Sequence, residues 1–134
     1  NMTNDVVGLR QTSAQVVEMS NMDRYGRRKD KQASGSGVDL GGKWEKTIRA
    51  AATNSETKLR LYGMGIGLSD HASFHRLKIP VADFTTGIHP DMHSPSDTAG
   101  KINSAGAISI LNIVDKLIET LAIRPEPIPF DGPK

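Results

Sequence analysis

The chain has 134 residues and a formal net charge of +2, with 24% charged and 37% hydrophobic residues. This length predicts at most one domain, and so small a net charge does not by itself indicate a nucleic-acid partner. The absence of cysteine excludes disulfide bonds and thiolate zinc sites, so any metal must be held by His, Asp or Glu. No apolar run approaches the roughly 18 residues of a membrane span, and we see no signal peptide in the sequence as given.

The first predicted element is a buried strand over residues 14–22, where β-branched and other apolar residues predominate and Asp23 follows the carboxyl end. Residues 24–43 are rich in charge, Ser and Gly, and we expect an irregular loop there. A helix is predicted over residues 43–54. The apolar residues on one face of this helix are Trp44, Ile48 and Ala51 or Ala52.

Two more strands and a short helix are predicted in the middle of the chain. Alternating polarity indicates a strand over residues 58–64. A short helix is expected over residues 70–77, with Ser69 as its N-cap. The third strand covers residues 81–85 and is apolar except for Asp83, which is unusual inside such a strand.

A long amphipathic helix is predicted after Asn103, which is a suitable N-cap. Its apolar residues at helical spacing are Ala107, Ile110, Leu111, Val114, Leu117, Ile118 and Leu121. Residues 124–134 carry four prolines, so we expect an extended or disordered tail after a domain over residues 1–123. Strands and helices alternate along the chain, which favours an α/β layered fold.

The loop from Thr86 to Thr98 follows the last predicted strand and carries two His, two Asp and two Pro. A loop at the carboxyl end of a strand is a common place for chemistry in α/β proteins. The four histidines of the chain are His71, His75, His89 and His93. Imidazoles interleaved with carboxylates suit a transition-metal ion, so the sequence predicts a metal site in this region.

Two other patterns have plainer explanations. His71 and His75 stand one helical turn apart, as in some zinc sites, but no Glu follows His71 as in the metalloprotease pattern. We therefore expect His71 to order a loop through hydrogen bonds and His75 to be solvated. A basic run with little aromatic interleaving is expected to be a solvated loop rather than a phosphate or nucleic-acid site. This run comprises Arg24, Arg27, Arg28, Lys29 and Lys31.

Three segments together resemble the dizinc exopeptidase family that includes aminopeptidase Y and the bacterial leucyl aminopeptidases. The first, residues 21–27, is similar to that family's Asn-x-Asp-Met-x-Gly-Arg motif. The second, residues 67–80, is similar to its Gly-x-Ser-Asp-His-x-x-Phe followed by Ile-Pro. The third, residues 86–98, leads into the last helix, and the resemblance covers roughly residues 14–122.

The resemblance implies a three-layer αβα fold with a partial mixed sheet, of the phosphorylase/hydrolase-like kind found in zinc exopeptidases. It also implies that Asp23 and His93 are zinc ligands, one for each of the two zinc ions in the complete domain. Carboxylate and imidazole ligands suit this role, because they leave positions open for an activated water. The implied substrate is a peptide, cleaved at its N-terminal residue.

Further residues are implied around the metals. Those expected to order ligands and loops are Asp70, His71 and Asp97. Those expected near the substrate are Met92, Gly67 and Leu68. The family usually has Tyr at the position of Met92, placed to help stabilise the tetrahedral intermediate, and Met cannot donate that hydrogen bond.

Other parts of the family's site are missing from this sequence. The remaining ligands of the family come from an upstream His-x-Asp and from a Glu-Glu pair whose first Glu is the general base, and no Glu-Glu occurs here. His89-Pro90-Asp91 spells His-x-Asp but lies in the spacer before His93. The chain therefore resembles the C-terminal portion of such a domain. We expect it to be inactive alone and to bind zinc weakly or not at all.

Two hypotheses of function stay open. The complete protein is a zinc aminopeptidase, or the chain is a non-catalytic binding or assembly domain with a degenerate peptidase fold. In either case a partial sheet leaves a strand edge and apolar surface uncovered, so we expect pairing with an N-terminal half or a homo-oligomer. Neither nucleic acid nor membrane is an expected partner, and the resemblance favours an exported or periplasmic location.

Overall fold

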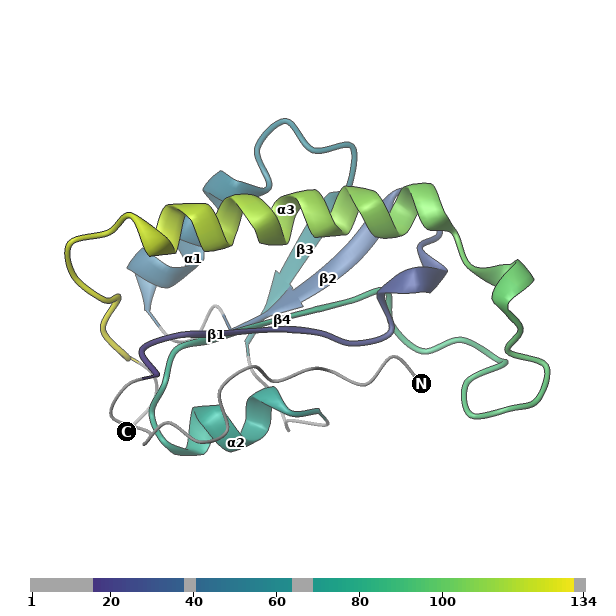
Figure 1. The fold of residues 1–134 in the computed structure, drawn as a ribbon, viewed down its shortest axis with the longest axis horizontal. Coiled ribbons are helices and arrows are strands. Elements are labelled where there is room, and N and C mark those ends of the chain that lie inside the picture. The colour runs from purple at the N-terminus through teal and green to yellow at the C-terminus, as the bar shows by residue number, and fades with distance from the viewer. Residues whose placement is uncertain (1–15, 38–40, 64–68, 132–134) are drawn as a thin grey trace.

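Four strands form one mixed sheet at the centre of the structure, a computed structural model that describes residues 16–37, 41–63 and 69–131 (Figure 1). The strands are β1 (Met19–Met22), β2 (Gln32–Ser36), β3 (Lys58–Tyr62) and β4 (Val81–Thr85). Their order across the sheet is β1-β4-β2-β3. β1 is parallel to β4, β2 is antiparallel to β4, and β3 is parallel to β2. The partial mixed sheet confirms the predicted fold class.

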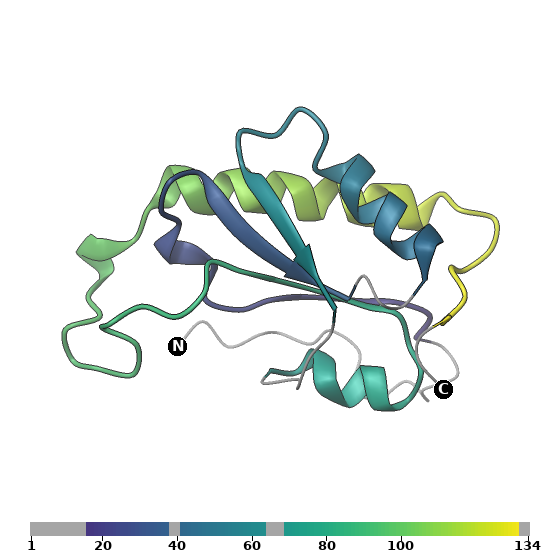
Figure 2. The same ribbon diagram turned by 180° about the vertical axis from the view of Figure 1, so that it is seen from behind.

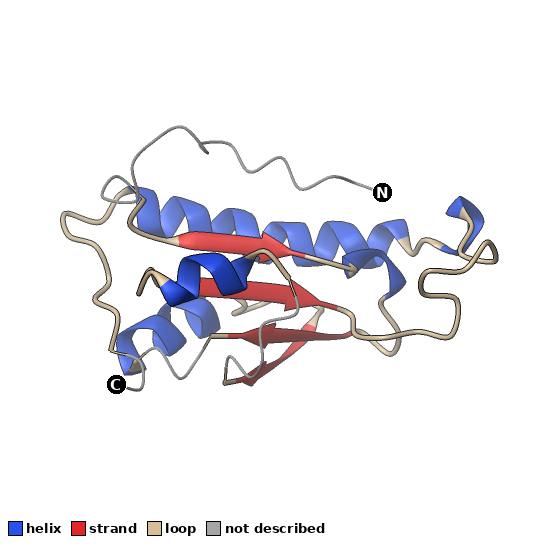
Figure 3. Cartoon of the chain, turned by 90° about the horizontal axis from the view of Figure 1, so that it is seen from below, coloured by secondary structure: helices blue, strands red, loops and turns tan. Residues whose placement is uncertain are grey.

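Helices cover both faces of this sheet. The α-helices are α1 (Gly42–Ala51), α2 (His71–Arg76) and α3 (Ser104–Ala122), and the 3-10 turns are η2 (Tyr25–Arg27) and η4 (Ala99–Lys101). α1 and α3 pack beside each other on one face, while α2 lies against β1 and β4 on the opposite face (Figures 1 and 2). Seen from the α2 side, the sheet lies between the two helical layers, as predicted (Figure 3).

The hydrophobic core lies under α1 and α3. Trp44 of α1, Phe84 of β4, and Ile110 and Leu117 of α3 are fully buried together. The indole Nε1 of Trp44 donates to the carbonyl oxygen of Val81 at 2.8 Å, so its polar atom is satisfied inside the core. The predicted inward face of the first helix is confirmed, since its buried residues are Trp44, Ile48 and Ala51.

Strand β2 lies within residues 24–43, where an irregular loop was expected, so that prediction is wrong. Its sequence, Gln-Ala-Ser-Gly-Ser, contains no β-branched or aromatic side chain and gives no strand signal. Small residues suit its central position between β4 and β3, because a Cβ on Gly35 would lie 2.8 Å from Cδ2 of Leu61. Packing between neighbouring strands thus decides the structure of a segment whose own propensity is weak.

Helix α3 begins as predicted, and the face that it buries matches the predicted stripe in part, since Ile110, Val114 and Leu117 are buried. The side chain of Asn103 accepts a hydrogen bond from the backbone N–H of Gly106 at 2.8 Å, which confirms the N-cap. Leu111 and Ile118, two members of the predicted apolar stripe, are 38% and 53% exposed. Ile113, absent from that stripe, is buried. The helix therefore carries more apolar surface than the sheet beneath it covers.

The segments before β1 and after α3 lie together. β1 begins at Met19, later than predicted, and residues 16–18 are irregular. The tail is irregular to residue 131, yet Ile128 is buried and its backbone N–H donates to Oε1 of Glu18 at 3.2 Å. Among the described residues, no helix has the length and apolarity needed to cross a bilayer.

Candidate functional site

Asp23 stands directly after β1, at the carboxyl end of that strand. Its backbone N–H donates to the carbonyl oxygen of Phe84 at 3.1 Å, which continues the pairing with β4 past the strand end. Its side chain is 33% exposed, and its Oδ2 lies 3.3 Å from Nε of Arg24. The predicted zinc ligand is therefore held by its backbone and paired with a cation.

The loop that carries His93 leaves the same edge of the sheet, after β4. β1 and β4 are parallel neighbours, so their carboxyl ends meet there. The backbone N–H of Thr86 donates to the carbonyl oxygen of Arg24 at 3.2 Å, and Nη1 of Arg24 lies 3.5 Å from Sδ of Met92. Arg24 thus contacts both Asp23 and the residue before His93, so both predicted ligands belong to segments that meet at one edge.

Two residues at this edge have left-handed backbone conformations. The φ angle is 56° at Arg24 and 58° at His93. Such conformations cost a non-glycine residue about 1–3 kcal/mol, and they persist where surrounding contacts enforce them, often at functional sites. His93 itself is exposed to solvent. Both residues belong to segments that carry the sequence motifs, although Asp30, Lys31, Asn54 and Lys78 have positive φ as well.

An ion-pair network orders the loop on both sides of His93. Arg27 donates to Oδ2 of Asp91 at 2.7 Å and also to Oδ1 of Asp97. Lys101 donates from Nζ to Oδ1 of Asp91 at 2.7 Å. These hydrogen bonds from Lys101 and Arg27 hold the pKa of the Asp91 carboxyl well below its usual range. Asp97, expected to order this loop, is a member of the network.

Arg24 and Arg27 are only partly exposed, whereas a solvated loop is predicted for the basic run. Their side chains are 26% and 16% exposed, and both guanidinium groups are paired with carboxylates. The lysines at positions 29 and 31 are exposed. The basic run gave no indication of this pairing, because the acidic partners of Arg27 stand 64 and 70 residues later in the chain.

A buried polar cluster lies behind this edge, on the face that α2 covers. Nδ2 of Asn21 donates to Oδ1 of Asp83 at 2.8 Å and to Oγ of Ser69 at 3.0 Å. Nδ1 of His71 lies 3.5 Å from the same Oδ1 of Asp83. Burial raises the pKa of the Asp83 carboxyl, against the opposing influence of the Asn21 hydrogen bond and of His71. The sequence predicts hydrogen bonds for His71 but gives no sign of Asn21, and its one sign of Asp83 is a carboxylate inside an apolar strand.

The other predicted features of α2 differ from expectation. Ser69 belongs to the buried cluster, and the N-cap position is held by Asp70 without a side-chain capping bond. His75 is not fully solvated: its ring packs on Phe130 with centroids 5.3 Å apart, and its Nε2 is buried without a hydrogen-bond partner in the described structure. His71 and His75 thus have separate surroundings, which does not suit a zinc pair.

The donor types at the sheet edge fit zinc, but they supply only part of a site. Protein zinc sites need three or four protein ligands. Within the part of the chain that the structure describes, no group of three or more His, Asp or Glu side chains lies close enough to share an ion. Asp23 and His93 carry donor types that zinc accepts, and their segments meet at this edge. Gly67 and Leu68, expected near the substrate, lie outside the described residues.

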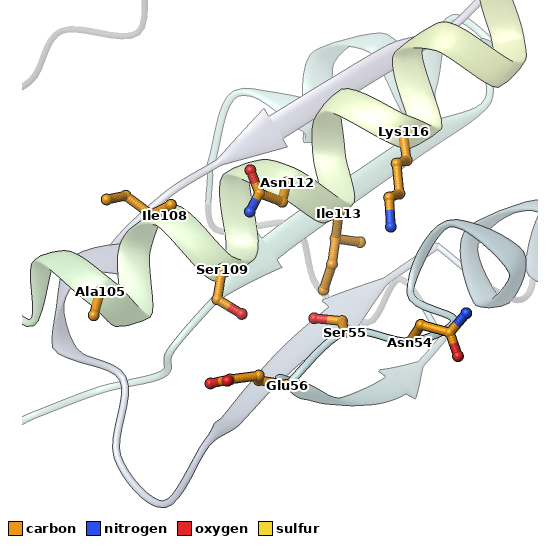
Figure 4. A pocket seen from close by; sticks show the side chains of 9 residues that line it. All are labelled: Asn54, Ser55, Glu56, Ala105, Ile108, Ser109, Asn112, Ile113 and Lys116. Atoms are coloured by element: carbon orange, nitrogen blue, oxygen red, sulfur yellow. The ribbon is translucent and has the colours of Figure 1, made fainter.

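A cavity of about 330 Å³ lies between α3 and the segment that connects α1 to β3 (Figure 4). Its lining includes Asn54, Glu56, Asn112 and Lys116. None of the predicted site residues lines it. The cavity is therefore separate from the candidate metal centre.

The same fold occurs in known peptidases. Residues 4–118 match the family described as peptidase family M28, and no curated protein matches the chain. The aminopeptidase from Aneurinibacillus sp. strain AM-1 is 25% identical at a TM-score of 0.69, covering 91% of this chain and 29% of that chain. LapA aminopeptidase of Legionella pneumophila is 19% identical at a TM-score of 0.69, covering 81% and 32%. LapB of the same organism is 16% identical at a TM-score of 0.67, covering 79% and 32%. The chain therefore spans about a third of the length of each of these proteins.

Proposed function

Because the chain belongs to peptidase family M28, we propose that it is the C-terminal portion of a zinc-dependent aminopeptidase that hydrolyses the N-terminal residues of peptides. The observation that carries this proposal is the meeting of Asp23 and the His93 loop at one edge of the sheet, joined through Arg24. The likeness to the Aneurinibacillus aminopeptidase supports the class of reaction.

In this proposal Asp23 holds one zinc ion and His93 holds the other. Bound zinc supplies an activated water at neutral pH and polarises the scissile carbonyl. The remaining work falls to residues of the chain itself. Nε of Arg24 lies 3.3 Å from Oδ2 of Asp23, so zinc would bind the other carboxylate oxygen or displace the guanidinium from Oδ2. Met92, beside His93, offers the developing oxyanion no hydrogen-bond donor.

We propose that the chain alone is inactive, since the other ligands and the general base would come from outside it. The test combines zinc, an aminoacyl anilide and the chain, alone or mixed with a polypeptide that supplies the rest of an M28 domain. No turnover is expected alone, and turnover is expected in the mixture. Asp23→Asn or His93→Ala should abolish that turnover. Full activity of both variants in the mixture would contradict the assigned ligands, and turnover by the chain alone would contradict its inactivity.

The completing partner is proposed to dock on the β1 side of the molecule. β1 is an end strand of the described sheet, and α3 lies over it while α1 lies towards β3 (Figure 3). The hydroxyl of Ser109 on α3 bonds that of Thr57, just before β3, at 2.7 Å, so this side of α3 faces β3. Leu111 lies about 200° around the helix axis from Ser109, and Ile118 lies on the same side of the helix as Leu111. An open strand edge thus lies beside exposed apolar helix surface.

An N-terminal half of the domain, or a second copy of the chain, would cover this surface. A strand added in parallel to β1 would end beside Asp23, which is where the missing ligands are needed. Light scattering at tens of micromolar should detect self-association that Ile118→Lys weakens. A clean monomer that binds no complementary polypeptide would contradict the proposal.

The second candidate is a non-catalytic binding or assembly domain with a degenerate peptidase fold. The ion pair between Arg24 and Asp23 favours it, because the guanidinium already neutralises the proposed ligand. Sequence upstream of Asn1 distinguishes the two: a His-x-Asp and a Glu-Glu on separate segments support the enzyme. An exported or periplasmic location is also proposed, on the family resemblance alone.

A further inference from the structure

The turn directly after Asp23 holds both ends of the loop that carries His93. The loop begins where the backbone N–H of Thr86 donates to the carbonyl oxygen of Arg24 at 3.2 Å. It ends where the backbone N–H of Asn103 donates to the carbonyl oxygen of Gly26 at 2.9 Å. Entrance and exit are therefore bonded to a single short segment that is continuous with Asp23.

Between these two ends, the side chain of Arg27 binds the loop on both sides of His93. Its Nη2 donates to Asp91, two residues before His93, and its Nη1 donates to Asp97, four residues after it. The Arg27 side chain is only 16% exposed and that of Asp91 only 19%. A guanidinium is planar and rigid, so two carboxylates bound to its two ends are held at a fixed separation.

Neutralising charge is not the main task of Arg27 in this arrangement. Asp91 already has a cationic partner in Lys101, at 2.7 Å, and a hydroxyl donor in Ser96, also at 2.7 Å. Within the described part of the chain, Arg27 bridges Asp91 and Asp97 across the turn that contains His93. His89 adds a longer contact across the same turn, from its Nε2 to Oδ2 of Asp97 at 3.8 Å. Backbone hydrogen bonds from Met92 to His89 and from Ser94 to Asp91 tighten the same turn.

We propose that Arg27 is a positioning residue that fixes His93 relative to Asp23, so that one turn of the chain sets the separation of the two metal-binding side chains. This inference rests on the proposed function for its purpose, but its geometry stands without zinc. In this role Arg27 acts through the loop, by way of Asp91 and Asp97.

The first test measures loop order by NMR in the metal-free chain. Wild-type backbone order parameters over residues 89–97 should be near the value of about 0.85 found in rigid backbone. Arg27→Gln removes the charge and the bridge, and Arg27→Lys keeps the charge but cannot bridge. Both variants should lower the order parameters of this loop to below about 0.6 and shift the ring signal of His93, while β4 and α3 keep theirs.

The matched control is Arg49→Gln, which breaks the exposed pair between Arg49 and Glu45 on α1 and should leave His93 unchanged. Wild-type loop order in Arg27→Lys would mean that charge alone holds the loop, and it would overturn the positioning role. Unchanged order in Arg27→Gln would overturn it as well.

The second test uses the completed domain and separates this inference from the proposed function. Arg27→Lys should weaken zinc binding about 10- to 100-fold, which is the typical loss when a residue that orients a metal ligand is mutated. Unchanged zinc affinity would overturn the positioning role. If the completed domain has no peptidase activity while the loop still depends on Arg27, the proposed function fails and the positioning of His93 stands.

Discussion

The two faces of the sheet are built from different chemistry. Under α1 and α3, the buried side chains are mainly apolar. The indole nitrogen of Trp44 donates to the Val81 carbonyl oxygen, and the buried hydroxyl of Thr57 bonds Ser109 of α3 and Arg28. Under α2, the buried groups are an amide, an imidazole and a carboxylate, those of Asn21, His71 and Asp83. One face is held mainly by the burial of apolar surface, and the other is held by specific hydrogen bonds.

The two kinds of interior contribute differently to the stability of the fold and to the geometry of the site. Apolar packing has little direction and contributes in proportion to the area removed from water. A hydrogen-bonded cluster adds less net free energy but fixes where its members lie. Asn21 of the polar cluster lies on β1, and Asp23 directly follows that strand. The polar face therefore positions the site, while the apolar face supplies most of the stability.

The largest effect on stability is expected from a substitution at the centre of the apolar face. Trp44→Ala should lower the free energy of unfolding by about 3–5 kcal/mol, because it leaves a large cavity and removes the hydrogen bond to the Val81 carbonyl oxygen. Trp44 is the only tryptophan, so urea unfolding should be followed by circular dichroism. Leu77→Ala, at a 60% exposed position, is the control and should change stability by less than about 0.5 kcal/mol. Equal effects of the two variants would refute the assigned core.

The polar face should respond to a change of chemistry rather than of volume. Asp83→Leu should cost about 1–3 kcal/mol, because the buried amide of Asn21 loses its acceptor at 2.8 Å. Asp83→Asn keeps an acceptor oxygen and should cost less. Urea midpoints of the two variants give the comparison. A leucine variant more stable than the asparagine variant would show that this face, too, is held mainly by packing.

The sequence predicted elements well where periodicity or motif residues were strong, and poorly where distant partners decide. Strands β3 and β4 and the cap at Asn103 lie where the pattern placed them. β2 was missed because small residues that fit between two strands carry no local signal. The motifs brought Asp23 and His93 to one edge, but the roles of Arg27 and Asp83 depend on partners more than sixty residues away, which a linear pattern does not contain.

A smaller effect is expected where α3 begins. Asn103→Ala should cost about 1 kcal/mol, because it removes the N-cap bond to Gly106 and the bond from Nδ2 to the carbonyl oxygen of Arg28 at 2.9 Å. Asn112→Ala, at an exposed position inside the same helix, should be neutral or slightly stabilising, since Ala is the better helix former. Thermal unfolding of both variants measures the difference. Equal melting temperatures would mean that the apolar face alone holds the helix.

The smallest effects should appear as opposite pH dependences of two carboxylates. Asp83 has a raised pKa in the folded protein, so the folded state binds its proton more tightly than the unfolded state does. The stability of the wild type relative to Asp83→Asn should therefore fall as pH rises above the ordinary pKa of 3.8. Asp91 has a lowered pKa, so its contribution is present above 3.8 and is lost as pH falls below it. Urea midpoints measured against pH for the wild type, Asp83→Asn and Asp91→Asn should give difference curves of opposite slope. Parallel slopes would mean that the polar face and the Arg27 network do not differ in the way proposed, because burial would dominate both carboxylates.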